Sequence, residues 1–199
     1  NLFKVHQMEN RNLFAVLLAA GSSRRFGSTK QLAEIDGVSL AARAARLCES
    51  VCEERSVLVL GNDWARVHDA CEPLLGFIAI NPDFETGIAT SIRRGVNAIR
   101  ENADGMLLML ADQPRVSDTH LKALEARWRE SPQSIVASAY ADTLGPPIIF
   151  PKQDFPALSE LHGDTGAKAI LLDNPDRLQT IECEAAAIDI DVQEDLQRL

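Results

Sequence analysis

The chain alternates between short apolar runs and longer segments in which apolar residues recur at helical spacing. Short apolar runs bounded by turn residues are typical of buried strands. On this pattern we predict strands at residues 13–20, 57–60, 77–80, 106–110, 135–139, 148–150, 177–181 and 185–190. The run at 106–110 is apolar throughout, so we expect it at the centre of a sheet.

Helical spacing is clearest at residues 87–100, where one face carries Ile88, Ile92, Val96 and Ile99. Further helices are predicted at residues 39–51, 64–75 with a break at Pro73, 118–129, 154–161, 165–172 and 192–199. We expect Ser117 to cap the helix at 118–129, because a hydroxyl accepts a free N–H at a helix start. Pro146 and Pro147 place the following strand at an edge or a bend.

Strands that alternate with helices indicate a mainly parallel sheet covered on both faces. A length of 199 residues supports one domain with a substantial core and is too short for two ordinary domains. We therefore predict a single α/β domain over residues 13–199. Residues 1–12 are interpreted as an N-terminal extension, with Met8 as a candidate native start.

Composition narrows the functional class. The apolar content of 46% and charged content of 25% are those of a soluble globular protein. The net charge of −9 disfavours a nucleic-acid partner, because no basic stripe is available to neutralise phosphates. No apolar run is long enough to span a membrane. An anionic substrate must therefore be attracted by local cations, and Arg24, Arg25 and Lys30 form such a cluster.

The four cysteines form neither a Cys-x-x-Cys pair nor a zinc-binding pattern, and the four histidines are scattered. Cys48 and Cys52 are four residues apart and share a helix face, for which we prefer an apolar role to metal binding. This cysteine usage is typical of a reducing compartment, so we expect a cytoplasmic protein.

One loop combines glycine with fixed positive charge. After the strand predicted at 13–20 the chain continues as Gly21-Ser22-Ser23-Arg24-Arg25-Phe26-Gly27-Ser28-Thr29-Lys30. Gly21 allows a tight turn in which successive N–H groups point at an anion, and Arg25 and Lys30 add charge beside it. We interpret the loop as a phosphate site. The alternative is a solvated turn with incidental cations.

The spacing excludes two commoner phosphate loops. A Walker A loop ends in Gly-Lys-Ser/Thr, whereas Ser28 and Thr29 separate Gly27 from Lys30 here. A dinucleotide-binding loop needs a second glycine two residues after the first, at the position of Ser23.

A second motif, Leu110-Ala111-Asp112-Gln113-Pro114, directly follows the central apolar run. Open α/β sheets bind ligands at the carboxyl ends of their strands, and Asp112 lies at such an end. If the runs at 13–20 and 106–110 are neighbours, Asp112 faces the glycine-containing loop. A carboxylate beside a polyphosphate calls for a divalent cation between them, such as Mg²⁺. Capping of the next helix is the alternative, but Ser117 fits that role better.

Asp189 and Asp191 lie two residues apart near the C-terminus. On a strand end their side chains point the same way, which makes them a candidate carboxylate pair. The alternative is a helix N-terminus rich in acidic residues, favoured by the helix dipole. That alternative explains Glu194 and Asp195 well and Asp189 poorly.

The motifs resemble the signature Leu-Ala-Ala-Gly-x-Ser-x-Arg-Phe/Met-Gly-x-x-Lys of the nucleotidyltransferases. Within that class the chain is most similar to the molybdenum cofactor cytidylyltransferases of the MocA-like family, from about Leu13 to Leu196. Ala20 fits cytidylyl transfer, since guanylyl enzymes usually carry glycine there. The family sequence Asp-Ile-Asp-Thr-Pro-Glu-Asp differs here at Val192 and Gln193, which affects the turn and not the carboxylates.

The resemblance implies a Rossmann-like, nucleotide-diphospho-sugar-transferase (GT-A-like) three-layer sandwich. The implied reaction transfers CMP from CTP to the terminal phosphate of molybdopterin cofactor and releases pyrophosphate, with Mg²⁺ or alternatively Mn²⁺ as the metal. Catalytic roles fall to Arg25, Lys30 and Asp112. Metal ligands are expected among Asp112, Asp189 and Asp191, with Asp189 preferred over Asp191. Nucleotide binding is assigned to Leu18, Ala19, Ala20, Gly21, Ser23, Arg25, Lys30, Gly87, Ser91 and Asp112.

Two weaker segments gain meaning from the resemblance. Residues 86–95 resemble the family pattern Gly-Met-Ala/Ser-Ser/Thr-Ser-Leu-x-x-Gly, with Gly87, Ser91 and Gly95 aligned. This makes Ser91 a candidate for recognising cytosine; a plain helix start is the alternative. The acceptor side is assigned to Gln113, Pro114, Pro147, Gly163, Asp164 and Gly166. Gly163 and Gly166 are also expected to bracket a helix start whose free N–H groups could hold a phosphate, with a loop and helix cap as the alternative.

Other functions are compatible with the same motifs. The chain could be a nucleotidyltransferase that uses GTP or another phosphorylated acceptor. It could instead be a non-catalytic carrier that inserts finished cofactor into a molybdenum hydroxylase, but such a protein has no need of Arg25, Lys30 and Asp112 at this spacing. A degenerate nucleotide-binding regulator is a third possibility. A molybdenum hydroxylase client is a candidate partner.

Overall fold

A seven-stranded sheet forms the centre of the protein. The computed structural model describes residues 11–23 and 25–198, so most of the N-terminal extension expected at residues 1–12 lies outside the described residues. The order across the sheet is β5-β4-β1-β6-β8-β7-β9. The strands are β1 (Leu13–Ala19), β4 (Ser56–Leu60), β5 (Phe77–Ile80), β6 (Gly105–Leu110), β7 (Ile135–Tyr140), β8 (Thr143–Pro151) and β9 (Leu178–Glu182).

The sheet is mainly parallel. β1 pairs in parallel with β4 and β6, β4 with β5, and β7 with β9, whereas β8 runs antiparallel between β6 and β7. The predicted single α/β domain with a mainly parallel sheet is confirmed. The wholly apolar β6 is the fourth of the seven strands, as expected for a run that is buried on both faces.

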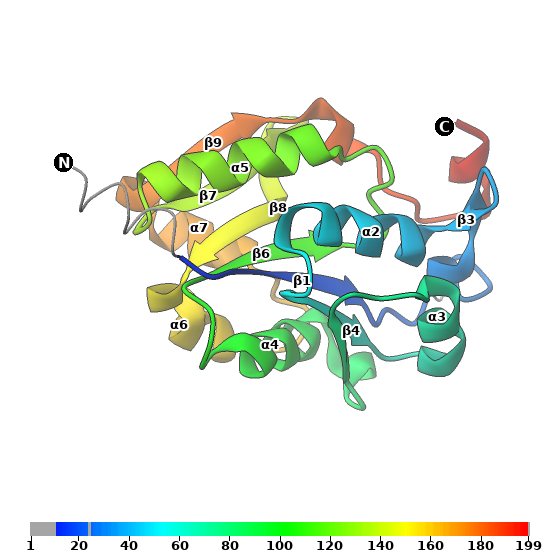
Figure 1. The fold of residues 1–199 in the computed structure, drawn as a ribbon. Coiled ribbons are helices and arrows are strands. Elements are labelled where there is room, and N and C mark those ends of the chain that lie inside the picture. The colour runs from blue at the N-terminus through cyan, green and yellow to red at the C-terminus, as the bar shows by residue number, and fades with distance from the viewer. Residues whose placement is uncertain (1–10, 24, 199) are drawn as a thin grey trace.

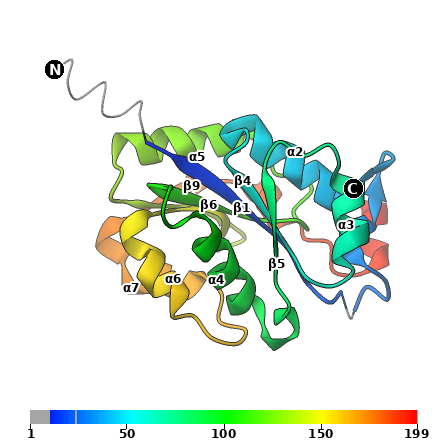
Figure 2. The same ribbon diagram turned by 60° about the horizontal axis from the view of Figure 1, so that its bottom comes forward.

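Helices cover both faces of the sheet (Figures 1 and 2). On one face lie α2 (Leu40–Cys52), α3 (Trp64–Cys71) and α5 (Asp118–Glu130), and on the other α4 (Ile88–Ile99), α6 (Phe155–Ser159) and α7 (Lys168–Asp173). The Ser117 hydroxyl accepts the N–H of His120 at 3.2 Å, which confirms the predicted cap of α5. Ser39 caps α2 in the same way through the N–H of Ala42.

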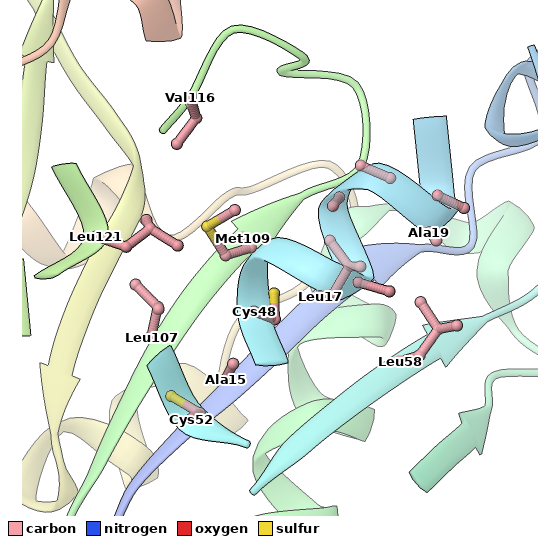
Figure 3. Close-up of a cluster of buried hydrophobic side chains, with 14 of the residues drawn as sticks. Ala15, Leu17, Ala19, Cys48, Cys52, Leu58, Leu107, Met109, Val116 and Leu121 are labelled. Carbon is pink, nitrogen blue, oxygen red and sulfur yellow. The ribbon is translucent and has the colours of Figure 1, made fainter. Parts of the chain in front are cut away.

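The sheet has one apolar core on each face. Figure 3 shows part of the core beneath α2, where Ala15, Leu17 and Ala19 of β1 pack against Cys48 and Cys52. Both cysteines are buried free thiols, so the predicted apolar role of this helix face is confirmed. Burial raises the pKa of Cys52 to about 12, and that of Cys48 is raised as well. These thiols therefore stay protonated.

The strand that follows Pro146 and Pro147 does not lie at a sheet edge, so of the two predicted places, an edge or a bend, the edge is wrong. β8 lies between β6 and β7 and contains both prolines. The pairing with β7 shifts register between Ala137 and Ser138, opposite the two prolines. Because a bulge removes residues from the ladder, the missing proline N–H groups cost no hydrogen bond there. The alternative expectation, a bend, describes this place correctly.

The strand predicted at 185–190 and the helix at 192–199 are also wrong. The chain forms a 3₁₀ turn at Glu184–Ala187, an irregular stretch and a second 3₁₀ turn at Gln193–Arg198, while residue 199 lies outside the described residues. The irregular stretch bonds to the loop after β6 instead of a strand: Ile190 donates its N–H to the Asp112 carbonyl at 3.0 Å. Tertiary contacts therefore override the apolar pattern at 185–190.

Other departures are small. The helix predicted at 64–75 ends at Cys71, and those at 154–161 and 165–172 shorten to α6 and α7. Further 3₁₀ turns are Lys30–Leu32, Phe84–Thr86, Lys152–Asp154 and Pro175–Arg177, and a hairpin of β2 (Glu34–Ile35) and β3 (Val38–Ser39) was not predicted. Within the described residues, none of the helices has the length and apolar character needed to cross a membrane.

Close packing of α4 on β1 gives a test of the fold. A Cβ at Gly95 would overlap the Cγ1 atom of Val16. Glycine to alanine alone favours a helix by about 1 kcal/mol, whereas overpacking costs about 1–3 kcal/mol. We expect Gly95→Ala to lower the free energy of unfolding in urea by up to about 2 kcal/mol, the difference between these two effects. Arg94→Ala, at the exposed neighbouring position, should stay within about 0.5 kcal/mol of wild type. A more stable Gly95→Ala variant would contradict this packing.

Candidate functional site

A cavity of about 440 Å³ opens at the carboxyl ends of β1 and β6. Its lining comes from the loop after β1, the start of α4, the end of β6 and the C-terminal segment. Among the predicted nucleotide-binding residues it includes Leu18, Ala20, Gly21, Ser23, Arg25, Lys30, Gly87, Ser91 and Asp112. Ala19 is not among the lining residues; it points into the core beneath α2, because successive side chains of a strand alternate between faces.

The loop after β1 is held open by a network that sequence reasoning missed. Gln31 is buried, and its Nε2 donates to the Gly21 carbonyl at 3.1 Å. The Ser23 hydroxyl donates to Gln31 Oε1 at 3.1 Å and accepts the N–H of Lys30 at 3.0 Å. Ser23 itself has a φ of 52°, in the left-handed region. A polar amide directly after Lys30 was the only signal for Gln31 in the sequence.

This loop has the features of an anion site. Among the described residues, the N–H groups of Gly21, Ser22 and Ser23 have no hydrogen-bond partner, and all three residues line the cavity. Free N–H groups on successive residues make a concavity that attracts anions. Arg25 adds an exposed guanidinium at the rim, whereas Arg24 lies outside the described residues.

Lys30 lies between two carboxylates. Its Nζ is 2.8 Å from Asp112 Oδ2 and 3.5 Å from Asp191 Oδ1, and its side chain is only 14% exposed. Arg25 Nη2 lies 3.1 Å from Asp191 Oδ2. β1 and β6 are neighbours, so Asp112 faces the loop after β1 as expected. Two cations and two carboxylates thus form one connected network at the cavity.

Asp189 belongs to the same electrostatic environment. Partial desolvation raises its pKa to about 6, and the negative charges of Asp112 and Asp191 act in the same direction, although the residue keeps an exposed face. The prediction that Asp189 and Asp191 share one face of a strand is wrong, because this segment is irregular. Burial of Ile190 against Phe26 and Leu40 holds both carboxylates near the cavity instead. Asp195 accepts the N–H groups of Asp191 and Val192, which fits the alternative of an acidic helix N-terminus for this residue.

The carboxylates fit a shared divalent cation better than a closed metal site. Within the part of the chain that the structure describes, no group of three or more His, Cys, Asp or Glu side chains could hold a metal ion by itself. A cation that also binds phosphate oxygens needs only one or two carboxylates. Asp112 Oδ1 is buried without a hydrogen-bond partner among these residues, so it has a lone pair to offer. All-oxygen donors suit Mg²⁺ or Mn²⁺.

The start of α4 forms the opposite wall of the cavity. Gly87 has a φ of 114°, and a Cβ there would overlap the backbone of Gly163. The N–H of Ala89 donates to the Gly163 carbonyl at 3.1 Å, which joins the 162–166 loop to the first turn of α4. Ser91 is 5% exposed and lines the cavity one turn further along.

The predicted acceptor-side residues do not form one group. Asp164 lines the cavity beside Gly87, and Gly163 contacts Gly87. Gly166 does not bracket a helix start, because α7 begins at Lys168. Gln113, Pro114 and Pro147 are not among the residues that line this cavity.

Gln113 is a structural link between distant segments. It is buried, and its Nε2 donates to the carbonyls of Ala186 at 2.9 Å and Pro146 at 3.1 Å. The carbonyl of the adjacent Pro147 accepts from the Ser138 hydroxyl. Gln113 and Pro114 also line a separate cavity of about 480 Å³ between α2 and the loop before α5. The predicted acceptor-side residues therefore lie in three places: at the first cavity, at the second cavity, and where β8 contacts Ser138 of β7.

Comparison with known proteins points to one family. Residues 15–179 match the MobA-like NTP transferase domain. The chain is 30% identical to the purine catabolism protein PucB of Bacillus subtilis over 82% of each protein. It is 31% identical to nicotine blue oxidoreductase of Paenarthrobacter nicotinovorans, over 92% of this chain and 94% of that protein. A probable molybdenum cofactor guanylyltransferase of Synechococcus elongatus is 31% identical over 60% of this chain and 58% of its own length.

Solved structures share the fold of this chain. Rv0371c from Mycobacterium tuberculosis superposes with a TM-score of 0.83 at 27% identity, covering 94% of this chain and 96% of that one. A complex of the same protein with manganese superposes with a TM-score of 0.78 at 25% identity, covering 94% and 97%.

Proposed function

The chain belongs to the family of MobA-like NTP transferase domains and is a nucleotidyltransferase, and we propose that it transfers CMP from CTP to the terminal phosphate of molybdopterin cofactor. The observation that carries this proposal is the network of Arg25, Lys30, Asp112 and Asp191 at the cavity. It places two cations and two carboxylates beside a loop with free N–H groups. Such an arrangement suits a nucleoside triphosphate with a divalent cation.

The reaction forms one P–O bond and breaks another. An oxygen of the acceptor phosphate attacks the α-phosphorus of the nucleotide in line, and pyrophosphate leaves with the bonding electron pair. The acceptor phosphate is already ionised, so no general base is required. Catalysis then consists of alignment and charge stabilisation, for which the positions of the cations matter most.

Each charged residue has a role in this scheme. Arg25, at the exposed rim, holds the leaving pyrophosphate with its forked guanidinium. Lys30, deeper in the cavity, faces the charge that develops at the α-phosphate. Asp112, together with Asp189 or Asp191, would hold a divalent cation. When bound, this cation would neutralise negative charge on the phosphate oxygens. Binding of phosphates to Lys30 and Arg25 releases the carboxylates that these cations neutralise in the free protein.

Choice of base is the finer part of the proposal. Ala20 and Ser91 line the cavity, and we assign them to a small pyrimidine. GTP is the second candidate, because related proteins are named molybdenum cofactor guanylyltransferases. The acceptor assignment draws on the same relatives. A molybdenum hydroxylase client, an insertion factor in place of an enzyme, and the acceptor roles of Gln113, Pro114 and Pro147 stay predictions.

The proposal is tested by incubating the protein with each nucleoside triphosphate, Mg²⁺ or Mn²⁺, and molybdopterin cofactor, and measuring pyrophosphate. Release that depends on both substrates supports nucleotidyl transfer. Nucleotide binding without turnover would favour a regulator. Oxidation or reduction of nicotine blue without pyrophosphate release would instead point to the chemistry in the name of the oxidoreductase relative.

Asp112→Ala should lower turnover by at least about a hundredfold, because it removes a ligand of the metal that neutralises the phosphates. The fold should survive, since Asp112 lies at the open end of β6. Pyrophosphate release across a Mg²⁺ titration measures the effect. Asp69→Ala, at an exposed position on α3, is the control and should behave as wild type. Near-normal activity of Asp112→Ala would reject the metal role.

Arg25→Ala should reduce kcat more than it weakens CTP binding, because the guanidinium stabilises the departing pyrophosphate. Arg24→Ala is the matched control and should affect neither quantity strongly. Arg25→Lys should rescue only in part, since an ammonium cannot make bidentate contacts. Steady-state kinetics and equilibrium CTP binding separate the two effects. Equal losses for both arginines would mean that the loop attracts anions only through its overall charge.

Specificity constants should favour CTP over GTP by about tenfold or more, since mispaired groups in a base site cost about 1–3 kcal/mol. Measured kcat/KM values with both nucleotides and the same acceptor decide the point. Equal or higher values with GTP would overturn the cytidylyl assignment and the role of Ser91 in recognising cytosine, while leaving nucleotidyl transfer intact.

A further inference from the structure

Asn81 is buried directly behind the proposed base site. It follows β5 and is 3% exposed, and its N–H continues the sheet by donating to the Leu60 carbonyl at 2.7 Å. Its side-chain Nδ2 donates to two hydroxyls of α4, Thr90 Oγ1 and Ser91 Oγ, each at 2.9 Å.

The orientation of the Asn81 amide is fixed by the backbone. Its Oδ1 accepts the N–H of Asp83 at 3.1 Å. A backbone N–H can only donate, so the oxygen must lie on that side and the NH₂ group must face α4. Asn81 is therefore a donor to both hydroxyls.

This orientation determines the polarity of Ser91. The Thr90 hydroxyl accepts from Asn81, and its own hydrogen is directed at backbone carbonyls, those of Gly87 at 2.9 Å and Asp83 at 3.1 Å. Ser91 also accepts from Asn81, but among the described residues its hydroxyl donates to no group. Because Ser91 lines the cavity, its hydrogen is available to a ligand there. Ser91 thus presents a donor.

We propose that Asn81 is a positioning residue that makes Ser91 a hydrogen-bond donor toward the base, so that the base edge opposite Ser91 must carry an acceptor, a ring nitrogen or a carbonyl oxygen. This inference rests on the proposed function, in which Ser91 contacts the base. An edge that presents an amino group to Ser91 brings two donors together and leaves a buried donor unpaired.

The test is a double-mutant cycle on equilibrium binding of CTP with Mg²⁺, measured by calorimetry. Asn81→Asp keeps the shape but replaces the donor with an acceptor, which turns the Ser91 hydrogen away from the cavity. The Kd should rise about tenfold, similar to the rise in Ser91→Ala, since one hydrogen bond to the base is lost in each case. In the Ser91→Ala background, Asn81→Asp should change the Kd by less than about twofold, because non-additivity marks residues that act through one another.

Thr90→Val is the matched control. It removes the other hydroxyl that Asn81 bonds, so it should lower the melting temperature while leaving the CTP Kd within about twofold. Asn81→Ala provides a second cycle if Asn81→Asp fails to fold. Steady-state kinetics of the Asn81 variants add a further readout. KM should rise while kcat stays nearly constant, because the lost hydrogen bond stabilises the ground state and the transition state equally.

The outcomes distinguish failure of the positioning role of Asn81 from failure of the proposed function. Equal effects of the Asn81 substitution with and without Ser91 would overturn the positioning role and leave Asn81 as a structural link between β5 and α4. An unchanged Kd in Asn81→Asp would overturn it too. Failure of the wild-type protein to bind any nucleoside triphosphate would instead reject the proposed function. Non-additive losses with an intact Thr90→Val variant establish the inference.

Discussion

The site depends on the placement of one ammonium group between two carboxylates. Lys30 reaches Asp112 and Asp191 from a loop that follows β1, and its side chain is largely withdrawn from solvent. The ammonium offsets the repulsion between the two carboxylates, and Arg25 adds a second positive charge beside Asp191. Removal of Lys30 would increase the repulsion between the acidic groups. The parallel pairing of β1 with β6 makes the arrangement possible, since both strands end at the same edge of the sheet.

The C-terminal segment completes that charge network without regular secondary structure. Ile190 is buried against Phe26 and Leu40, and its N–H bonds to the Asp112 carbonyl. Gln193 Nε2 also donates to the Phe26 carbonyl at 3.3 Å. The segment is thus attached both to the loop after β1 and to the loop after β6. Asp189 and Asp191 flank the buried Ile190, so an apolar contact positions two carboxylates that would otherwise repel each other and separate.

The two walls of the cavity come from different segments of the chain and, under the proposed function, contact different parts of the nucleotide. The wall made by the loop after β1 offers N–H groups and cations, which suit phosphates of any nucleotide. The wall made by the start of α4 depends on the close approach of Gly87 to Gly163 and on the bonds from Asn81 to Thr90 and Ser91. Under the proposed function, discrimination between bases belongs to this second wall, because directional hydrogen bonds distinguish edges that charge cannot.

The sequence by itself determined the alternating α/β fold, the central place of β6 and the loop with Arg25 and Lys30, because apolar periodicity and glycine chemistry act locally. It could not place Gln31, Asn81 or Gln113, whose roles depend on partners distant in the fold. It also misassigned residues 185–190 as a strand. Only the tertiary structure decided that this segment bonds to the loop after β6, because apolar residues in irregular chain and in a strand give the same local pattern.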